Sequence, residues 1–266
     1  MRLSKKIDGQ IRVIGMVHLS PLPGSPRFGG SIAQIEENAL RDARLLVENG
    51  VDGLMIENFG DAPFYKDRVR SHTIALIARI AWQIRELTND MPIGINVLRN
   101  HAAAAIGIAS AVGASFVRVN IHTGAMLTDQ GVIEGRAAQT MRYRREIGCG
   151  ALVMADVAVK HATRLGEFTL EDIARDTAYR GCADALILSG AGTGLPTSPE
   201  SARRVKQAVP DRPIWIGSGV NVHNLEQYAP MIDGAIVGTE FKIDALTTNP
   251  VDPKRVAAFI KKIRNS

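Results

Sequence analysis

The sequence predicts an α/β protein with the (β/α)8 TIM-barrel fold. Eight short aliphatic or β-branched segments recur along the 266 residues, about 20 to 40 residues apart. Most are separated by an amphipathic stretch long enough for a helix, and eight such alternations within about 250 residues match a closed barrel. A doubly wound open sheet is the alternative fold. Its Gly-x-Gly-x-x-Gly fingerprint is absent, because the first segment leads through His18 into a proline-rich loop.

The predicted strands enter the sheet in two ways. They cover residues 11–18, 52–58, 92–97, 115–120, 151–156, 184–189, 213–217 and 233–238. The even-numbered strands resemble one another at their start, and Gly50, Gly113 and Gly181 suit the left-handed backbone position that ends a helix. Two odd-numbered strands begin at Pro92 and Pro213, where the missing backbone N–H is tolerated. This recurrence supports a repeated strand–helix unit.

The segments between the strands carry helix signals. Ser31 can cap a helix with Gln34 three residues later, and Ser198-Pro199 and Asp252-Pro253 are starts of the cap-plus-proline kind. Three apolar stripes at helical spacing follow the first, second and last strands. Their members are Ile32, Ile35, Ala39, Ala43, Leu46 and Val47; Ile74, Ile77, Ala81, Ile84 and Leu87; and Val256, Phe259, Ile260 and Ile263.

Composition excludes several classes of protein. A hydrophobic content of 45% and a charged content of 22% are globular values, so a disordered chain is excluded. Two cysteines cannot form the set of disulfides that would be needed to cross-link a chain of this length. No apolar run approaches the roughly 18 to 20 residues of a membrane span. The first residues are basic but no apolar segment of a signal peptide follows, so we expect a cytoplasmic protein with a single domain over residues 1–266.

The charge pattern bears on the partner. The formal net charge is +5, from 32 basic and 27 acidic residues, and the basic residues are scattered among the acidic ones. Nucleic-acid binding would need a basic stripe with aromatic residues between, so no nucleic-acid partner is predicted. A mildly positive field suits a phosphorylated small molecule, and an ordinary solvated surface is the alternative. Barrels often dimerise, which leaves a homo-oligomer open.

The strand exits are nearly all polar or glycine. In a barrel, ligands bind where the carboxyl ends of the strands meet, so these exits predict a ligand site. We expect the asparagine amides to orient substrate hydroxyl groups. The predicted substrate-binding residues are Asn58, Asn96, Asn120, Lys160, Ser189 and Thr193. For Lys160, four residues past its strand, an ion pair or a phosphate contact is expected rather than an imine.

The last two exits predict a phosphate site. Glycine lets backbone N–H groups approach an anion, and the start of a helix adds partial positive charge. The alternative is that both segments are only tight turns. The predicted phosphate-binding residues are Gly217, Ser218, Gly219, Gly238 and Thr239, and Lys242 is expected to add positive charge.

Glu57, Asp156 and His18 are the predicted catalytic residues. Both carboxylates lie at strand exits, where burial or a neighbour can shift a pKa toward neutrality. They come from strands two and five, so they can approach each other across the mouth. Two carboxylates and a histidine can also hold a divalent cation. No metal-binding spacing is present, so no cofactor and no metal ligand are predicted, although a divalent metal stays an option.

Motifs along almost the whole chain carry a family resemblance. They are Gly15-Met-Val-His-Leu-x-Pro-Leu-Pro-Gly24, Glu57-Asn-Phe-Gly-Asp61, Asn96-Val-Leu-Arg-Asn100, Ala155-Asp-Val-x-Val-Lys-His161, Ser189-Gly with Thr193-Gly, Gly217-Ser-Gly-Val220 and Asn249-Pro-Val-Asp252. With these motifs the sequence resembles the BtpA/SgcQ family. The resemblance implies a TIM barrel of the ribulose-phosphate-binding type. One branch of that family is named for photosystem I biogenesis, and another lies among predicted sugar-metabolism proteins.

These observations lead to one main hypothesis and two rivals. The main hypothesis is an enzyme acting on a phosphorylated sugar or a nucleoside-like phosphate, by isomerisation, aldol-type cleavage or cleavage of a glycosidic bond. The first rival is a non-catalytic assembly or regulatory factor of the photosystem I biogenesis type. The second rival is a metal-dependent hydrolase.

Overall fold

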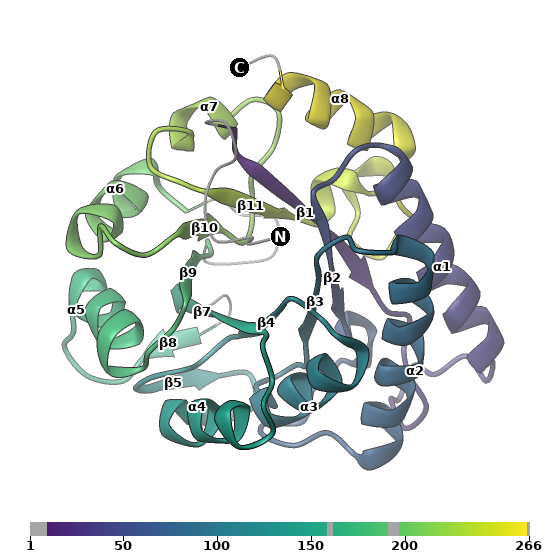
Figure 1. The fold of residues 1–266 in the computed structure, drawn as a ribbon, viewed down its shortest axis with the longest axis horizontal. Helices are drawn as coiled ribbons and strands as arrows, with labels where there is room; N and C mark the ends of the chain where they lie inside the picture. The colour runs from purple at the N-terminus through teal and green to yellow at the C-terminus, as the bar shows by residue number, and fades with distance from the viewer. Residues whose placement is uncertain (1–9, 159–161, 191–196, 265–266) are drawn as a thin grey trace.

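Eight parallel strands close into a barrel surrounded by helices (Figure 1). The structure is a computed structural model, and it describes residues 10–158, 162–190 and 197–264. Around the barrel the order is β1-β11-β10-β9-β7-β4-β3-β2. The strands are β1 (Arg12–His18), β2 (Gly53–Glu57), β3 (Ile93–Asn96), β4 (Phe116–Val119), β7 (Leu152–Ala158), β9 (Ala185–Leu188), β10 (Ile214–Ile216) and β11 (Gly234–Val237). Each predicted strand overlaps one of them, so the predicted TIM barrel is confirmed.

Three of the helices, α1, α6 and α8, begin where the sequence predicts a start. Their bounds are α1 (Ile32–Glu48), α2 (Ser71–Thr88), α3 (Ala102–Val112), α4 (Ala137–Glu146), α5 (Leu170–Arg175), α6 (Pro199–Ala208), α7 (Leu225–Tyr228) and α8 (Pro253–Arg264). The Ser31 side chain accepts from the backbone N–H of Gln34, and the Ser198 side chain does the same for Ser201 ahead of Pro199. A π-helical turn, η2 (Asp176–Arg180), continues α5, and short 3-10 turns are η1 (Phe59–Asp61), η3 (Thr239–Phe241) and η4 (Ile243–Ala245).

One predicted glycine conformation is wrong. Gly50 and Gly113 have positive φ angles of 87° and 63°, as expected after a helix. Gly181, however, has φ of −78°, and the left-handed residue is its neighbour Cys182, with φ of 57°. Glycine is needed at position 181 for space, because a Cβ there would lie 2.9 Å from the His122 ring.

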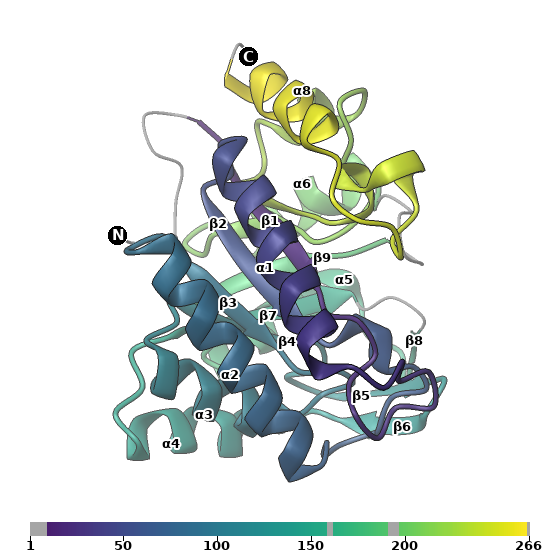
Figure 2. The same cartoon turned by 90° about the vertical axis from the view of Figure 1, so that its right-hand side faces the viewer.

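A three-stranded antiparallel sheet covers one side of the barrel mouth. It has the order β6-β5-β8, from β5 (Ala125–Thr128), β6 (Gly131–Glu134) and β8 (Ala162–Arg164). Figure 2 shows it beyond the end of the barrel at which α1 begins. The first two strands follow β4 and the third follows β7, so the sheet joins the loops of two adjacent barrel strands. The sequence analysis did not predict it.

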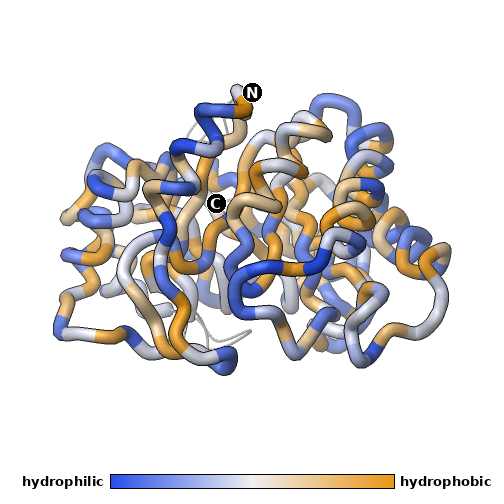
Figure 3. The backbone as a smooth tube through the Cα atoms, turned by 90° about the horizontal axis from the view of Figure 1, so that it is seen from below, coloured by the Kyte–Doolittle hydropathy of each residue, from blue (hydrophilic) through white to orange (hydrophobic). Residues whose placement is uncertain are grey.

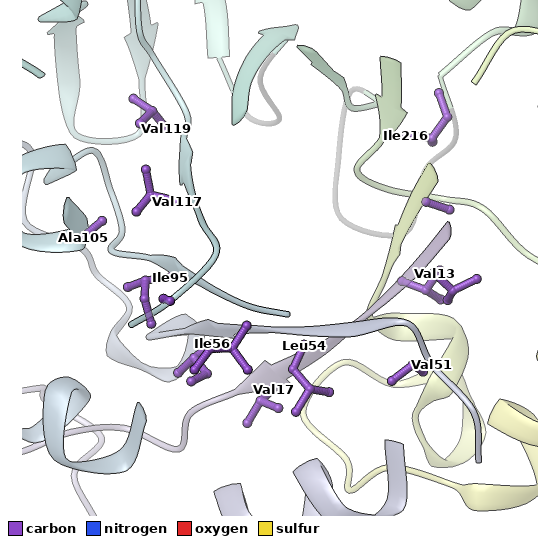
Figure 4. Packing of buried hydrophobic residues seen from close by; sticks show 14 of the residues in the cluster. Val13, Val17, Val51, Leu54, Ile56, Ile95, Ala105, Val117, Val119 and Ile216 are labelled. Carbon is purple, nitrogen blue, oxygen red and sulfur yellow. The ribbon is translucent and has the colours of Figure 1, made fainter. Parts of the chain in front are cut away.

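Alternation along each strand divides the apolar residues between two cores. Val13 and Val17 of β1 point outward into the layer under the helices, part of which is shown in Figure 4, and Ile14 and Met16 point into the barrel. Along the outer helices, apolar and polar stretches alternate (Figure 3). None of the helices in the described part of the chain combines the length and apolar character that a membrane crossing needs.

Two aromatic rings fill the barrel interior by lying over glycines of neighbouring strands. A Cβ on Gly94 would lie 2.1 Å from the Phe116 ring, and a Cβ on Gly234 would lie 2.2 Å from the Trp215 ring. Both rings are fully buried. The interior below the mouth is therefore packed rather than open, and the space for a ligand lies at the carboxyl ends of the strands.

Candidate active site at the barrel mouth

Register brings polar side chains from successive strands to one level. His18 is paired with Glu57, Glu57 with Asn96, and Asn96 with Arg118. All four follow the inward parity of their strands, two residues beyond the apolar interior positions on β1, β2 and β4. The top inward layer of these strands is therefore polar.

A cavity of about 380 Å³ opens above this layer. Residues 217–221 and 237–240, which follow β10 and β11, form one wall, and Met16 and Ile236 form an apolar floor. His18, Glu57 and Arg118 supply the ionisable groups of the strands that line it. The two glycine turns and the predicted catalytic residue Glu57 thus share one cavity.

Both glycine turns begin in direct contact with these ionisable side chains. A Cβ on Gly217 would lie 2.9 Å from Ser189 Oγ and 3.2 Å from Arg118 Nη2. A Cβ on Gly238 would lie 2.9 Å from His18 Cε1. Any side chain at either position would displace its neighbour, so glycine here permits a close approach.

The turn after β10 presents backbone donors to the cavity. Asn224 Nδ2 donates to the Gly219 carbonyl at 2.7 Å, and Asn224 Oδ1 accepts from the Asn221 N–H at 2.9 Å, which fixes the loop. Gly219 has a φ of 70°. Within the described residues, the backbone N–H groups of Gly219 and Val220 have no acceptor. Because α7 is a single turn, the predicted contribution of a helix start is small here, and the N–H groups of Gly219 and Val220 are the donors that this turn can offer to an anion.

Asp156 is enclosed by hydrogen-bond donors. Arg118 Nε donates to Asp156 Oδ2 and Arg118 Nη2 to Oδ1, both at 2.8 Å. Ser189 Oγ donates to Oδ1 at 2.9 Å, and Asn120 Nδ2 donates to Oδ2 at 3.3 Å. The Asp156 side chain is fully buried. This carboxylate is the anchor of a fixed guanidinium.

The protonation state of Arg118 follows from this pairing. Burial by itself lowers the pKa of the guanidinium. The charge and hydrogen bonds of Asp156, with a further contribution from the charge of Glu57, outweigh burial and leave the pKa of Arg118 raised. Arg118 is therefore a permanent cation at the base of the cavity.

Two of the predicted substrate contacts lie behind Arg118. Asn96 Nδ2 donates to the Arg118 carbonyl and to Asn120 Oδ1, both at 3.1 Å. Asn96 and Asn120 are buried. In this arrangement their amides support the Arg118–Asp156 pair, and Ser189 belongs to the same network.

Glu57 and His18 lie side by side at the other wall. His18 Nε2 is 3.8 Å from Glu57 Oε1, and the His18 ring stacks on Phe59 with centroids 4.7 Å apart. The backbone N–H of Leu19 donates to the Glu57 carbonyl at 2.8 Å, which ties the two strand ends together. A carboxylate and an imidazole in this geometry can exchange protons with a ligand in the cavity.

Other predicted residues have different places. Asn58 Oδ1 accepts from the Leu98 N–H at 2.7 Å, and Asn58 Nδ2 donates to Asp61 Oδ2 at 3.0 Å. Asn58 lines a second cavity of about 320 Å³ outside the mouth. Thr239 lines the mouth cavity and shares a hydrogen bond with Thr247, and Ser218 lines it as well. Lys160 and Thr193 lie outside the described residues.

The prediction that Lys242 adds positive charge at the phosphate site is wrong. Lys242 is buried against α1, where its Nζ donates to Asp42 at 2.8 Å. Burial lowers the pKa of this lysine, and the Asp42 carboxylate opposes that shift. The charge beside the glycine turns comes from Arg118 instead.

Metal binding has no preformed site among the described residues. In that part of the chain no three His, Cys, Asp or Glu side chains are grouped as metal ligands would be. His18, Glu57 and Asp156 do not converge, because both oxygens of Asp156 accept from Arg118. Metal dependence is an option and not a prediction, and elemental analysis of the purified protein tests it.

Arg118 is the main site residue that sequence reasoning missed. It lies inside a strand rather than at the strand exit, where polar residues were sought. A signal was present in the period of two, since Phe116 and Arg118 share one face of β4 and Asn120 continues the same period just after the strand. A charged residue two positions before the predicted site residue Asn120 was the feature that could have identified Arg118.

Comparison with known proteins identifies relatives over nearly the whole chain. The family model described as the BtpA family matches residues 10–265. The photosystem I biogenesis protein BtpA of Synechocystis is 45% identical, over 94% of this chain and 86% of that protein. An uncharacterized protein of Pyrococcus furiosus is 44% identical, over 96% and 95%. The sgc region protein SgcQ of Escherichia coli is 34% identical, over 99% and 98%.

Solved structures share the fold at low sequence identity. Thiamine phosphate pyrophosphorylase from Pyrococcus furiosus has a TM-score of 0.58 and 13% identity, with 97% of each chain covered. Phosphoribosyl anthranilate isomerase from Thermus thermophilus has a TM-score of 0.59 and 11% identity, with 96% of this chain and 99% of that chain covered. At these identities the likeness concerns the barrel architecture.

Proposed function

This chain belongs to the BtpA family, and we propose that it is an enzyme acting on a phosphorylated sugar or a nucleoside-like phosphate at the mouth of its barrel. One observation carries the proposal: the two glycine turns begin against Arg118 and His18, so an anion-binding wall adjoins ionisable side chains in one cavity. The name of each of the two fold neighbours includes that of a phosphorylated compound. This supports a phosphate ligand at the barrel mouth by analogy only.

In this proposal the wall holds the phosphate. The backbone N–H groups of Gly219 and Val220 donate to phosphate oxygens, and the hydroxyl groups of Ser218 and Thr239 line the same space. Glu57 and His18 transfer protons. Asp156, predicted as a catalytic residue, instead positions Arg118, because its oxygens are occupied by donors.

A binding panel tests the proposal. The purified protein is titrated with inorganic phosphate, with aldose and ketose phosphates and with nucleoside monophosphates, and binding is followed by calorimetry and thermal unfolding. We expect at least one sugar phosphate to bind more tightly than inorganic phosphate. Absence of binding by every phosphorylated compound in the panel would overturn the proposal.

Two variants of equal size locate the phosphate site. Gly219 has a left-handed φ, which asparagine and aspartate adopt more readily than other side chains. Gly219→Asp places a negative charge in the turn, and Gly219→Asn is its neutral counterpart. We expect Gly219→Asp to weaken phosphate binding at least about tenfold relative to Gly219→Asn, through like-charge repulsion. Equal affinities of the two variants would place the phosphate elsewhere.

A non-catalytic assembly role is the second candidate, favoured by the name of the Synechocystis relative. It predicts that Glu57→Gln leaves the cellular role of the protein intact, whereas the enzymatic proposal predicts its loss. Complementation of a deletion strain by Glu57→Gln, with expression checked by immunoblot, separates the two.

A further inference from the structure

Arg118 is fixed on one side and open on the other. Its Nε and Nη2 are held by Asp156, and Nη2 also donates to Ser189 at 3.2 Å. Among the described residues, nothing accepts from Nη1, and the side chain lines the mouth cavity. A buried guanidinium with its bidentate partner already in place is a preorganised donor for one further oxygen.

That donor lies at a different depth from the glycine turn. Arg118 belongs to β4 and borders the floor made by Met16 and Ile236, whereas the N–H groups of Gly219 and Val220 lie beyond the end of β10. Residues 217 to 220 span at most about 11 Å when extended, and Gly217 adjoins Arg118. A ligand bridging the two donor sets is therefore a compact one, such as a triose to pentose phosphate.

The proposed proton-transfer groups, Glu57 and His18, line the same cavity as Arg118. The negative charge of Glu57 is close enough to raise the pKa of the guanidinium. His18 is 3.8 Å from Glu57. Removal of a proton next to a carbonyl group requires a base and, close to it, a fixed cation. The cation stabilises the negative charge that develops on the carbonyl oxygen.

Building on the proposed function, we propose that Arg118 binds the carbonyl oxygen of an α-hydroxycarbonyl phosphate and stabilises an enediolate. The Glu57 carboxylate takes the proton from the carbon next to the carbonyl. The electron pair of that C–H bond forms the C=C bond, and the C=O π pair moves onto oxygen, where Arg118 holds the charge. Glu57 then delivers the proton to the former carbonyl carbon. His18 moves the hydroxyl proton from the other oxygen of the enediolate to the former carbonyl oxygen. These steps complete an aldose–ketose isomerisation without any oxidant or reductant.

Ligands that differ only at the carbonyl test this assignment. Phosphoglycolohydroxamate mimics a phosphorylated enediolate, while glycerol 3-phosphate and ribitol 5-phosphate carry phosphate without a carbonyl. We expect the wild-type protein to bind the hydroxamate at least about 100-fold more tightly than glycerol 3-phosphate, the scale of one oxyanion donor. Ribose 5-phosphate and ribulose 5-phosphate in D2O, followed by NMR, are expected to exchange the C–H next to the carbonyl in the presence of the protein.

Two variants assign the roles. Arg118→Lys removes the fork that presents Nη1, and we expect it to lose most of the preference for the hydroxamate while glycerol 3-phosphate binding stays within about threefold. Arg12→Lys is the matched control, since Arg12 is a buried, ion-paired arginine at the opposite end of the same barrel, and it keeps the preference. Glu57→Gln keeps the Arg118–Asp156 pair, and we expect it to bind the hydroxamate but not to exchange deuterium.

The outcomes separate this inference from the proposed function. Failure of all phosphates to bind contradicts both. Phosphate binding without preference for the hydroxamate, or deuterium exchange that survives Glu57→Gln, overturns the enediolate assignment alone. Loss of glycerol 3-phosphate binding in a folded Arg118→Lys protein assigns Arg118 to the phosphate and overturns it too. Should Arg118→Lys not fold, the wild-type preference and Glu57→Gln decide.

Discussion

The Arg118–Asp156 pair is the most constrained feature of the site at the scale of single residues. Both side chains are removed from water, so the free energy of each charge depends on the other. We expect Asp156→Asn to lower the free energy of unfolding by about 3–5 kcal/mol, because it leaves a buried cation without its counter-charge. Urea unfolding monitored by circular dichroism measures this.

Glu171→Gln is the matched control for that prediction. Glu171 accepts from Arg204 Nε at 2.6 Å and from Arg204 Nη2 at 2.7 Å, but the Arg204 side chain is 45% exposed. Water solvates this guanidinium when the carboxylate is removed, so the variant is expected to unfold almost like the wild type. Similar losses of unfolding free energy in the two variants would mean that the cost of Asp156→Asn does not come from the burial of the ion pair.

Gly217 carries a second residue-scale prediction. A Cβ at this position would lie 2.6 Å from Ile187 Cγ2 and 2.9 Å from Ser189 Oγ. We expect Gly217→Ala to cost about 1–3 kcal/mol of unfolding free energy by overpacking and to weaken phosphate binding, as measured by urea unfolding and calorimetry. Gly150→Ala, where a Cβ meets nothing within 4 Å, serves as control and should stay within about 0.5 kcal/mol of the wild type.

Sequence reasoning at this scale found the residues that end strands. His18 and Glu57 stand at strand exits and line the cavity. Arg118 and the true surroundings of Lys242 escaped it, because one is an inward residue within a strand and the other pairs with Asp42, 200 residues away. Such partners depend on three-dimensional closure and leave no local pattern.

At the scale of elements, His122 links the loop after β4 to the end of η2. His122 Nε2 bonds the Gly181 carbonyl at 2.8 Å, and a carbonyl only accepts, so Nε2 carries the proton. Burial lowers the pKa of His122 below its usual range near 6.5, despite the hydrogen bond to Gly181 and the charge of Asp184. As the pH falls below about 6.5, His122 therefore binds a proton more readily in the unfolded chain than in the folded one.

This link predicts a pH dependence of stability. Because the folded pKa is lowered, the contribution of His122 is present above about pH 6.5 and is lost as the pH falls through the lowered value. We expect His122→Gln to reduce the loss of unfolding free energy between pH 7 and 5, since glutamine can donate to Gly181 without titrating. The exposed His223, changed to Gln, is the control. Equal pH slopes for wild type and His122→Gln would contradict the prediction.

The elements themselves differ in how well local signals predict them. The barrel strands and long helices carry apolar periodicity and caps, such as Ser31 and Ser198, and the sequence predicts them. The small sheet does not follow this rule, because β5 and β6 each bury a single residue, Met126 and Ile133, and their partner β8 lies in another loop. Pairing between loops on adjacent strands is a property of the closed barrel.

The whole molecule is predicted to unfold as one domain, and its two tryptophans allow a test. Trp215 is fully buried inside the barrel, whereas Trp82 is 50% exposed on α2. In a Trp82→Phe variant, fluorescence reports the barrel interior and circular dichroism reports the helices. We expect coincident transitions, as a two-state domain requires. Separate transitions would divide the chain into more than one unit.

Ligand binding acts on the same global equilibrium. A sugar phosphate present at 100 times its dissociation constant adds about 2.7 kcal/mol to the free energy of unfolding. For a chain of this size we expect Tm to rise by about 5–10 °C, measured by differential scanning calorimetry. At the same ligand concentration, a tenfold weaker Gly219→Asp variant should show about half of this shift, and an undiminished rise would indicate binding outside the mouth. The cytoplasmic location and a homo-oligomer stay predictions, the latter tested by light scattering.

The rings of Phe116 and Trp215, each lying over a glycine of a neighbouring strand, help to fill the barrel interior. Within the described residues, the ligand cavity is consequently closed at its lower end, and a ligand reaches it from the mouth. A molecule that reaches its bottom has to back out the way it came, so whatever group is last to enter is first to leave.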